Sequence, residues 1–127
     1  MATTGGTPTC LVQGTLLPNA APADPGQYKV GALDATTFQG LRATIQTLTI
    51  CNTDSGAHLV TLHLVASGGS PSAANTIFKA VPIAAGETLD AEMTRVSRTL
   101  ETGDFISAFA ETAGVVSFRA DGEITFT

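Results

Sequence analysis

The stretch that decides the fold reads Ala43-Thr-Ile-Gln-Thr-Leu-Thr-Ile50, then Asn52-Thr-Asp-Ser-Gly56, then His58-Leu-Val-Thr-Leu-His-Leu-Val-Ala66. Its first part mixes isoleucine and leucine with threonine, and β-branched side chains favour a pleated strand over a helix. Its last part alternates, which places Val60, Leu62 and Leu64 on one face. The polar residues in between are typical of a turn. We therefore predict two strands that pair as a hairpin with one buried face.

Similar alternating segments lie on both sides of this stretch, separated by residues that favour turns. They predict strands over 9–17, 27–33, 76–83, 88–93, 105–111, 115–120 and 123–127. Pro82 has no N–H to donate, so we expect it at a sheet edge or a strand end. We expect a tight hairpin at Thr112-Ala-Gly114, a turn at Asp121-Gly122, and the only helical turn within Asp34–Arg42.

This pattern of seven to nine short strands predicts an all-β fold, either an antiparallel β-sandwich or a related jelly roll. A length of 127 residues suits one such domain. We assign residues 9–127 to the domain, with 43–127 as its best-defined part. Residues 1–8 are assigned to a flexible N-terminal arm, because small polar residues cannot bury enough surface to offset the entropy of ordering.

Charged residues are scarce, at 13% of the chain, and the formal net charge is -5. Six residues are lysine or arginine and they form no run, so we expect no nucleic-acid partner. A surface of small and hydroxyl side chains loses its water at little cost, so this composition favours contact with other protein chains. No apolar stretch approaches about 18 residues and no signal-peptide pattern is present. We therefore expect no membrane segment and synthesis in a cytoplasm.

The histidines and cysteines give weak signals for chemistry. His58 and His63 are an odd number of positions apart in one strand, so they point to opposite faces and cannot share a metal ion. We expect both to be surface or partly covered histidines. Cys10 and Cys51 are expected to be buried free thiols, which are inert without a cationic neighbour.

The carboxylates and glycines are equally unspecific. Asp90 and Glu92 share one strand face and invite comparison with a glycosidase pair or a calcium site, but a solvated outer face accounts for them as well. Gly5-Gly6 and Gly68-Gly69 lack the Lys-Ser/Thr of a phosphate-binding loop. We therefore predict a protein that is not an enzyme and uses no metal and no cofactor.

The predicted strand that begins at Phe105 is apolar on both faces. Phe105 and Phe109 share one face, while Ile106, Ala108 and Ala110 share the other. Either this strand is central between two layers, or one of its faces is buried against another subunit. Together with the arm, this gives the following candidate assembly contacts: Met1, Ala2, Thr3, Thr4, Phe105 and Phe109.

Five segments can be read together: Leu48-Thr-Ile-Cys-Asn-Thr53, His58-Leu-Val-Thr-Leu-His-Leu-Val65, Ala74-Asn-Thr-Ile-Phe-Lys79, Val81-Pro-Ile-Ala-Ala-Gly-Glu87 and Thr102-Gly-Asp-Phe-Ile-Ser107. Their order resembles a family of small virion proteins of tailed bacteriophages, over residues 43–127. The resemblance implies a β-sandwich component of a phage particle. That component is either a minor capsid protein that decorates the head or an accessory of the tail or connector, and no catalytic residue transfers.

We therefore predict a non-enzymatic virion structural protein, made in the host cytoplasm, that binds the major capsid or tail proteins as a homo-oligomer. The number of copies in that oligomer is guessed to be three. The alternatives are a tail or connector accessory protein and a carbohydrate- or receptor-binding β-sandwich module. A sugar-binding module would need an exposed aromatic platform, whereas the chain has no tryptophan and a single tyrosine, Tyr28.

Overall fold

The computed structural model describes residues 7–23, 26–30, 42–92 and 98–125. These residues form nine β-strands and one short 3₁₀-helix, and no α-helix occurs among them. The elements are β1 (Thr7–Leu16), β2 (Tyr28–Lys29), β3 (Arg42–Asn52), β4 (His58–Val65), the 3₁₀-helix η1 (Ala73–Asn75), β5 (Thr76–Ile83), β6 (Thr88–Glu92), β7 (Arg98–Leu100), β8 (Phe105–Ala110) and β9 (Val116–Thr125).

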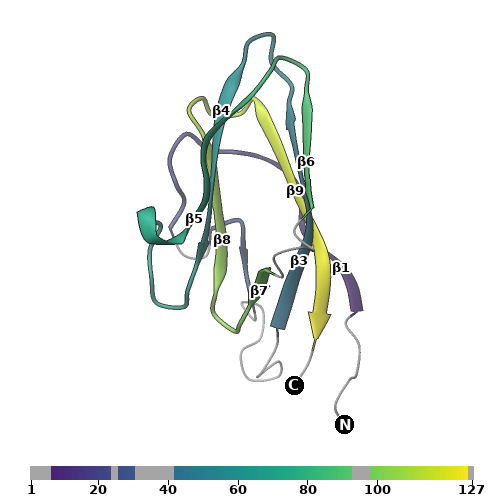
Figure 1. Ribbon diagram of the computed structural model, residues 1–127, viewed down its shortest axis with the longest axis vertical. Helices are drawn as coiled ribbons and strands as arrows, with labels where there is room; N and C mark the ends of the chain where they lie inside the picture. The colour runs from purple at the N-terminus through teal and green to yellow at the C-terminus, as the bar shows by residue number, and fades with distance from the viewer. Residues whose placement is uncertain (1–6, 24–25, 31–41, 93–97, 126–127) are drawn as a thin grey trace.

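The strands form two antiparallel sheets that pack face to face (Figure 1). The first sheet has the order β1-β9-β3-β6, with β7 also paired to β3. The second sheet has the order β2-β8-β4-β5. The prediction of an all-β sandwich is therefore confirmed.

The hydrophobic core lies between the two sheets. In β3, the side chains of Ala43, Ile45, Leu48 and Ile50 have no exposed surface. The alternation slips by one position between Ile45 and Leu48, because a β-bulge places an extra residue in the strand at this point. The second sheet contributes the fully buried side chains of Val60, Leu62, Ile106, Ala108 and Ala110.

The predicted hairpin within residues 43–66 is wrong, because its two strands belong to different sheets. β3 pairs with β9, β6 and β7, whereas β4 pairs with β5 and β8. Residues 53–57 therefore cross from one sheet to the other. Asn52 shapes this crossing: its buried amide donates to the carbonyls of Gly56 and Ile83, and its Oδ1 accepts the N–H of Asp54. Alternation did not reveal the crossing, since a strand buries one face in the core whether the next strand lies in its own sheet or in the opposite sheet.

Two further turn predictions are wrong. The segment at Thr112-Ala-Gly114 does not close a hairpin, because β8 lies in the second sheet and β9 in the first. Residues Asp121-Gly122 form no turn either, since β9 runs on to Thr125. A Cβ atom at Gly122 would overlap the carbonyl oxygen of Thr44, opposite the bulge in β3. This glycine therefore permits a close approach of two strands.

Several elements begin or end at other residues in the structure than the sequence predicts. Pro82 lies in the edge strand β5, as predicted. β1 begins at Thr7, so the last two residues assigned to the arm belong to the first sheet. The predicted strand over 27–33 reduces to Tyr28–Lys29 within the described residues. The helical turn expected within Asp34–Arg42 lies outside the described residues, except for Arg42, which belongs to β3.

Candidate functional site

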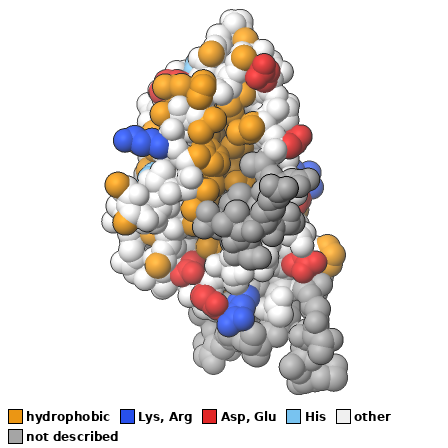
Figure 2. Space-filling view, in the orientation of Figure 1, with side chains coloured by type: hydrophobic (Ala, Val, Ile, Leu, Met, Phe, Trp, Pro, Cys, Tyr) orange, Lys and Arg blue, Asp and Glu red, His pale blue; other side chains and the backbone are white. Residues whose placement is uncertain are grey.

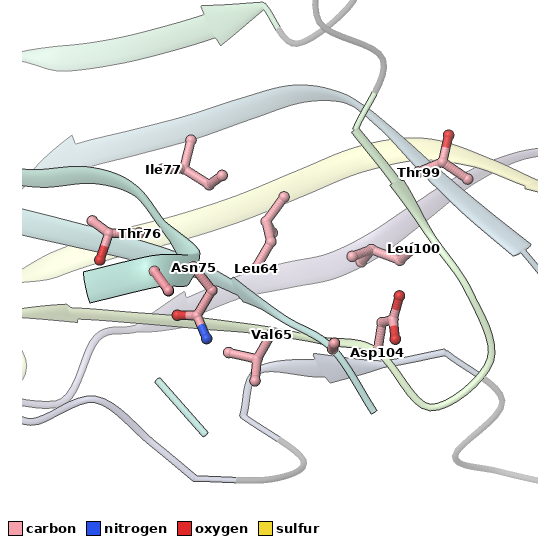
Figure 3. Close-up of a pocket in the computed structure, with 10 residues that line it drawn as sticks. Leu64, Val65, Asn75, Thr76, Ile77, Thr99, Leu100 and Asp104 are labelled. Atoms are coloured by element: carbon pink, nitrogen blue, oxygen red, sulfur yellow. The ribbon is translucent and has the colours of Figure 1, made fainter. Parts of the chain in front are cut away.

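A pocket of about 480 Å³ lies between the sheets, where β4 and β5 face β7 (Figure 3). Its apolar lining includes the side chains of Leu64, Val65, Ile77 and Leu100. The described residues that line it include no histidine, cysteine, lysine or arginine. Figure 2 shows a band of hydrophobic side chains along the gap between the sheets.

The polar side chains at this pocket hold the surrounding loops. The carboxylate of Asp104 accepts the N–H groups of Ser67 and Glu101, each at 2.9 Å. The side chain of Asn75 accepts the N–H of Ser72 at 2.9 Å and donates to the carbonyl of Ser70 at 2.8 Å. Asp104 is the single carboxylate among the described lining residues, and both of its oxygens already accept hydrogen bonds. The pocket is therefore an apolar cavity that contains no acid–base pair among these residues.

A second cluster surrounds His58, at the start of β4. Its Nε2 lies 2.7 Å from Oδ2 of Asp54, and its Nδ1 lies 2.5 Å from Oε1 of Glu111. The other carboxylate oxygen of Glu111 accepts the N–H of Leu59 at 2.7 Å. The side chain of His58 is 11% exposed, while those of the two carboxylates are about two-fifths exposed. The cluster therefore joins β4 to the connections after β3 and after β8.

His58, Asp54 and Glu111 shift one another's pKa values. The hydrogen bond to Asp54, followed by that to Glu111, raises the pKa of His58 above its ordinary value of 6.5. The hydrogen bond with His58 is the main cause that lowers the pKa of Asp54 below its ordinary value of 3.8. Partial burial alone would raise the pKa of Glu111, but the hydrogen bonds from Leu59 and His58 outweigh it and hold that pKa below 4.5. The fold thus favours the charged form of each group.

The expectation that the two histidines are surface or partly covered is wrong, because both are buried. His63 is 7% exposed. Its Nδ1 lies 3.1 Å from Oδ1 of Asn75 and 3.2 Å from Oγ1 of Thr76, and its ring stacks on Phe109 with the ring centroids 6.4 Å apart. Each histidine therefore has its own set of partners, on different parts of the fold.

The partners of His58 could be found in the sequence only in part. Asp54 precedes it by four residues within a turn-rich segment, which is a visible if unspecific signal. Glu111 lies 53 residues later and reaches His58 because β8 runs beside β4. No pattern within either segment indicates that contact.

Of the predicted assembly contacts, Phe105 lies inside the chain's own fold. Its side chain has no exposed surface, and neither has that of Ser107 on the same strand face. The hydroxyl of Ser107 donates to the carbonyl of Pro22 at 2.8 Å, and Gly26 packs against the ring of Phe105. The segment after β1 therefore covers this face. For Phe105 the structure supports the central-strand alternative, since a side chain without exposed surface cannot contact a partner.

The remaining candidate contacts have different positions. Phe109 is partly exposed, and its role as an assembly contact stays a prediction. Met1, Ala2, Thr3 and Thr4 lie outside the described residues.

The other candidate residues lie on three strands of the first sheet, namely Cys10 on β1, Cys51 on β3, and Asp90 and Glu92 on β6. Cys10 and Cys51 are free thiols, as predicted, but they are only partly buried. Asp90 is exposed, and the side chain of Glu92 lies outside what the structure describes. Within the described ranges, no group of three His, Cys, Asp or Glu side chains is arranged to hold a metal ion. No helix in the described part of the chain is long and apolar enough to cross a membrane.

No protein-family model matches this chain, and no curated protein matches its sequence.

Proposed function

We propose that this chain is a non-enzymatic structural protein of a bacteriophage particle, namely a minor capsid protein that decorates and stabilises the head as a homo-oligomer. Its partners are the major capsid protein and further copies of itself. The resemblance of five segments to small phage virion proteins supports the first part of this proposal. The observation that carries a role in assembly is the uncharged outer edge of β1.

β1 is an edge strand that can accept another strand. Among the described strands it is hydrogen-bonded to β9 alone. Its ten residues include no charged side chain, and Leu16 is 58% exposed. Pro8 and two bulges bend the strand, but no charge opposes its pairing with another chain. An extended segment of a neighbouring subunit would find both main-chain partners and apolar surface here.

The other edges are better protected against pairing. β5 carries Lys79 and Pro82, and the backbone of Ala80 between them has a positive φ of 51°. β6 carries Asp90 and Glu92. β2 and β7 have two and three residues, too few for an extended contact. Charge, proline and short length each discourage strand addition, which leaves β1 as the favoured edge.

Replacing Leu16 with lysine is expected to weaken self-association. The substitution removes apolar surface from the β1 edge of every copy and adds a charge there, so the dissociation constant should rise roughly tenfold or more. The measurement is light scattering coupled to size-exclusion chromatography over a range of concentrations. Leu59→Lys is the matched control, because Leu59 is the other exposed large hydrophobic residue within the described ranges and lies in β4, between two strands. Equal masses for the two variants would argue against the β1 edge as the contact.

Deleting Met1–Gly6 is expected to weaken attachment to the particle without loss of the fold. These residues precede the edge strand β1 in the sequence, and the proposal is that they extend the same contact onto a neighbour. The measurement is co-sedimentation with purified heads, alongside thermal unfolding of the truncated chain. We expect an unchanged unfolding temperature and a roughly tenfold loss of affinity. Binding to isolated tails instead of heads would assign the chain to the tail, and binding to neither would contradict the proposal.

A further inference from the structure

We propose that His58 is a pH-dependent lock that holds together two of the connections by which the chain crosses between the sheets at one end of the sandwich. One connection comprises residues 53–57, between β3 and β4, and the other comprises residues 111–115, between β8 and β9. This inference stands apart from the proposed function, because it rests on contacts within one chain.

The lock is defined by where its two carboxylates come from. Asp54 belongs to the first crossing and Glu111 to the second, and neither lies within a strand. The imidazole of His58 stands between them, 2.7 Å from one carboxylate and 2.5 Å from the other. One side chain therefore connects two loops that are far apart in the sequence.

The geometry requires a charged ring. A neutral imidazole has one N–H and one lone pair, so only one of its nitrogens can donate a hydrogen bond. At His58 both nitrogens face carboxylate oxygens. Loss of a proton from the ring would turn one of these hydrogen bonds into a contact between a lone pair and an anion. The neutral form must therefore lose its hydrogen bond to one of the two carboxylates.

The surroundings of the ring contain few other charged groups. β5 places Ile83 opposite His58, and β8 places Ala110 next to Val60, so both packed strands are apolar here. Near the first crossing, the turn after β5 contributes Glu87, whose side chain is exposed and whose carbonyl accepts the N–H of Asn52. Among the described residues, the titratable groups that contact the ring are thus the two carboxylates.

Contacts that do not titrate will remain when the lock opens. The N–H and the hydroxyl of Thr53 donate to the carbonyl of Val115, at 2.9 and 2.7 Å. The N–H of Glu111 also donates to the carbonyl of Leu59. We therefore expect the end of the sandwich to loosen without global unfolding.

The direction of the pH dependence follows from the shifts. Because the pKa of His58 is raised in the folded chain, its stabilisation is complete below about pH 6.5 and is lost as the pH rises through the raised value. Because the pKa values of both carboxylates are lowered, their stabilisation is complete above about pH 4.5 and is lost as the pH falls through the lowered values. The lock is therefore firmest between about pH 4.5 and pH 6.5.

The direct test is an NMR titration of the imidazole nitrogens in the wild-type chain. We expect both nitrogens of His58 to carry protons at about pH 6.5 and one of them to lose its proton at higher pH. The protection factor of the Leu59 amide, which donates to Glu111, should fall in the same pH range. A neutral His58 ring at pH 6.5, or a Leu59 protection factor that does not follow the titration, would overturn the proposal.

Two variants separate the charge from the shape of the cluster. Glu111→Gln and Asp54→Asn keep the side-chain size and remove the charge, so each should lower the pH at which His58 titrates. His58→Gln should lose most of its difference in melting temperature from wild type between about pH 5.5 and the pH at which the NMR titration shows a neutral His58, because the lock in the wild-type chain opens over that range. If the difference in melting temperature between His58→Gln and wild type stays constant with pH, His58 is not charged in the folded chain, however large that difference is.

Discussion

Replacing Phe105 with aspartate is expected to prevent the chain from folding. The side chain has no exposed surface, and the aspartate would be an unpaired charge beneath the segment that contains Pro22 and Gly26. Loss of a buried phenylalanine alone costs about 3–5 kcal/mol, and small domains are stable by about 5–15 kcal/mol. Circular dichroism and one-dimensional NMR of the purified variant provide the measurement.

Phe109→Asp is the matched control for this variant. Phe109 lies on the same face of the same strand but is partly exposed, so its aspartate can reach water. We expect this control to fold with a lowered unfolding temperature. A folded Phe105→Asp variant that fails only to assemble would show instead that Phe105 contacts a partner subunit.

Replacing Gly122 with alanine is expected to lower the free energy of unfolding by about 3 kcal/mol. Its new methyl group would overlap the carbonyl oxygen of Thr44, and this neighbour is backbone within a paired strand. β9 or β3 must therefore shift to make room. The midpoint of denaturation by urea, at an unchanged slope, measures the loss.

Gly14→Ala is the control, because it makes the same substitution in the neighbouring strand β1. A Cβ atom at Gly14 meets nothing within 4 Å. We expect a change within about 0.5 kcal/mol for this control. If the two variants lose equal stability, a general cost of side chains in these strands is the cause, and not the close approach at Gly122.

The all-β class could be read from the sequence because alternation is a local property. The runs from Ala43 to Asn52 and from His58 to Val65 are strands in the structure, at nearly the predicted limits. Their partners could not be predicted in the same way. A strand buries the same alternate residues whether the next strand lies in its own sheet or in the opposite one. Turn residues such as those at 53–57 also occur in both kinds of connection.

The roles of the candidate site residues also depend on contacts between distant segments, which the sequence pattern does not reveal. The apolar character of both faces of β8 was visible in the sequence, but only the position of the segment after β1 decides that Phe105 is covered within the chain. The role of His58 depends on Glu111, which the pairing of β8 with β4 brings to it. Gly122 reads as a turn residue because glycine at a turn and glycine at a close approach look alike in a sequence.

The most direct test of the proposed function is a count of this chain in purified particles released by the host cells that make it. Quantitative mass spectrometry of those particles, after treatment that removes loosely bound protein, gives the number of copies per major capsid subunit. The proposal predicts a fixed ratio that is the same in mature particles and in isolated heads. Absence of the chain from the particles, with all of it recovered free in the lysate, would contradict a structural role in the virion.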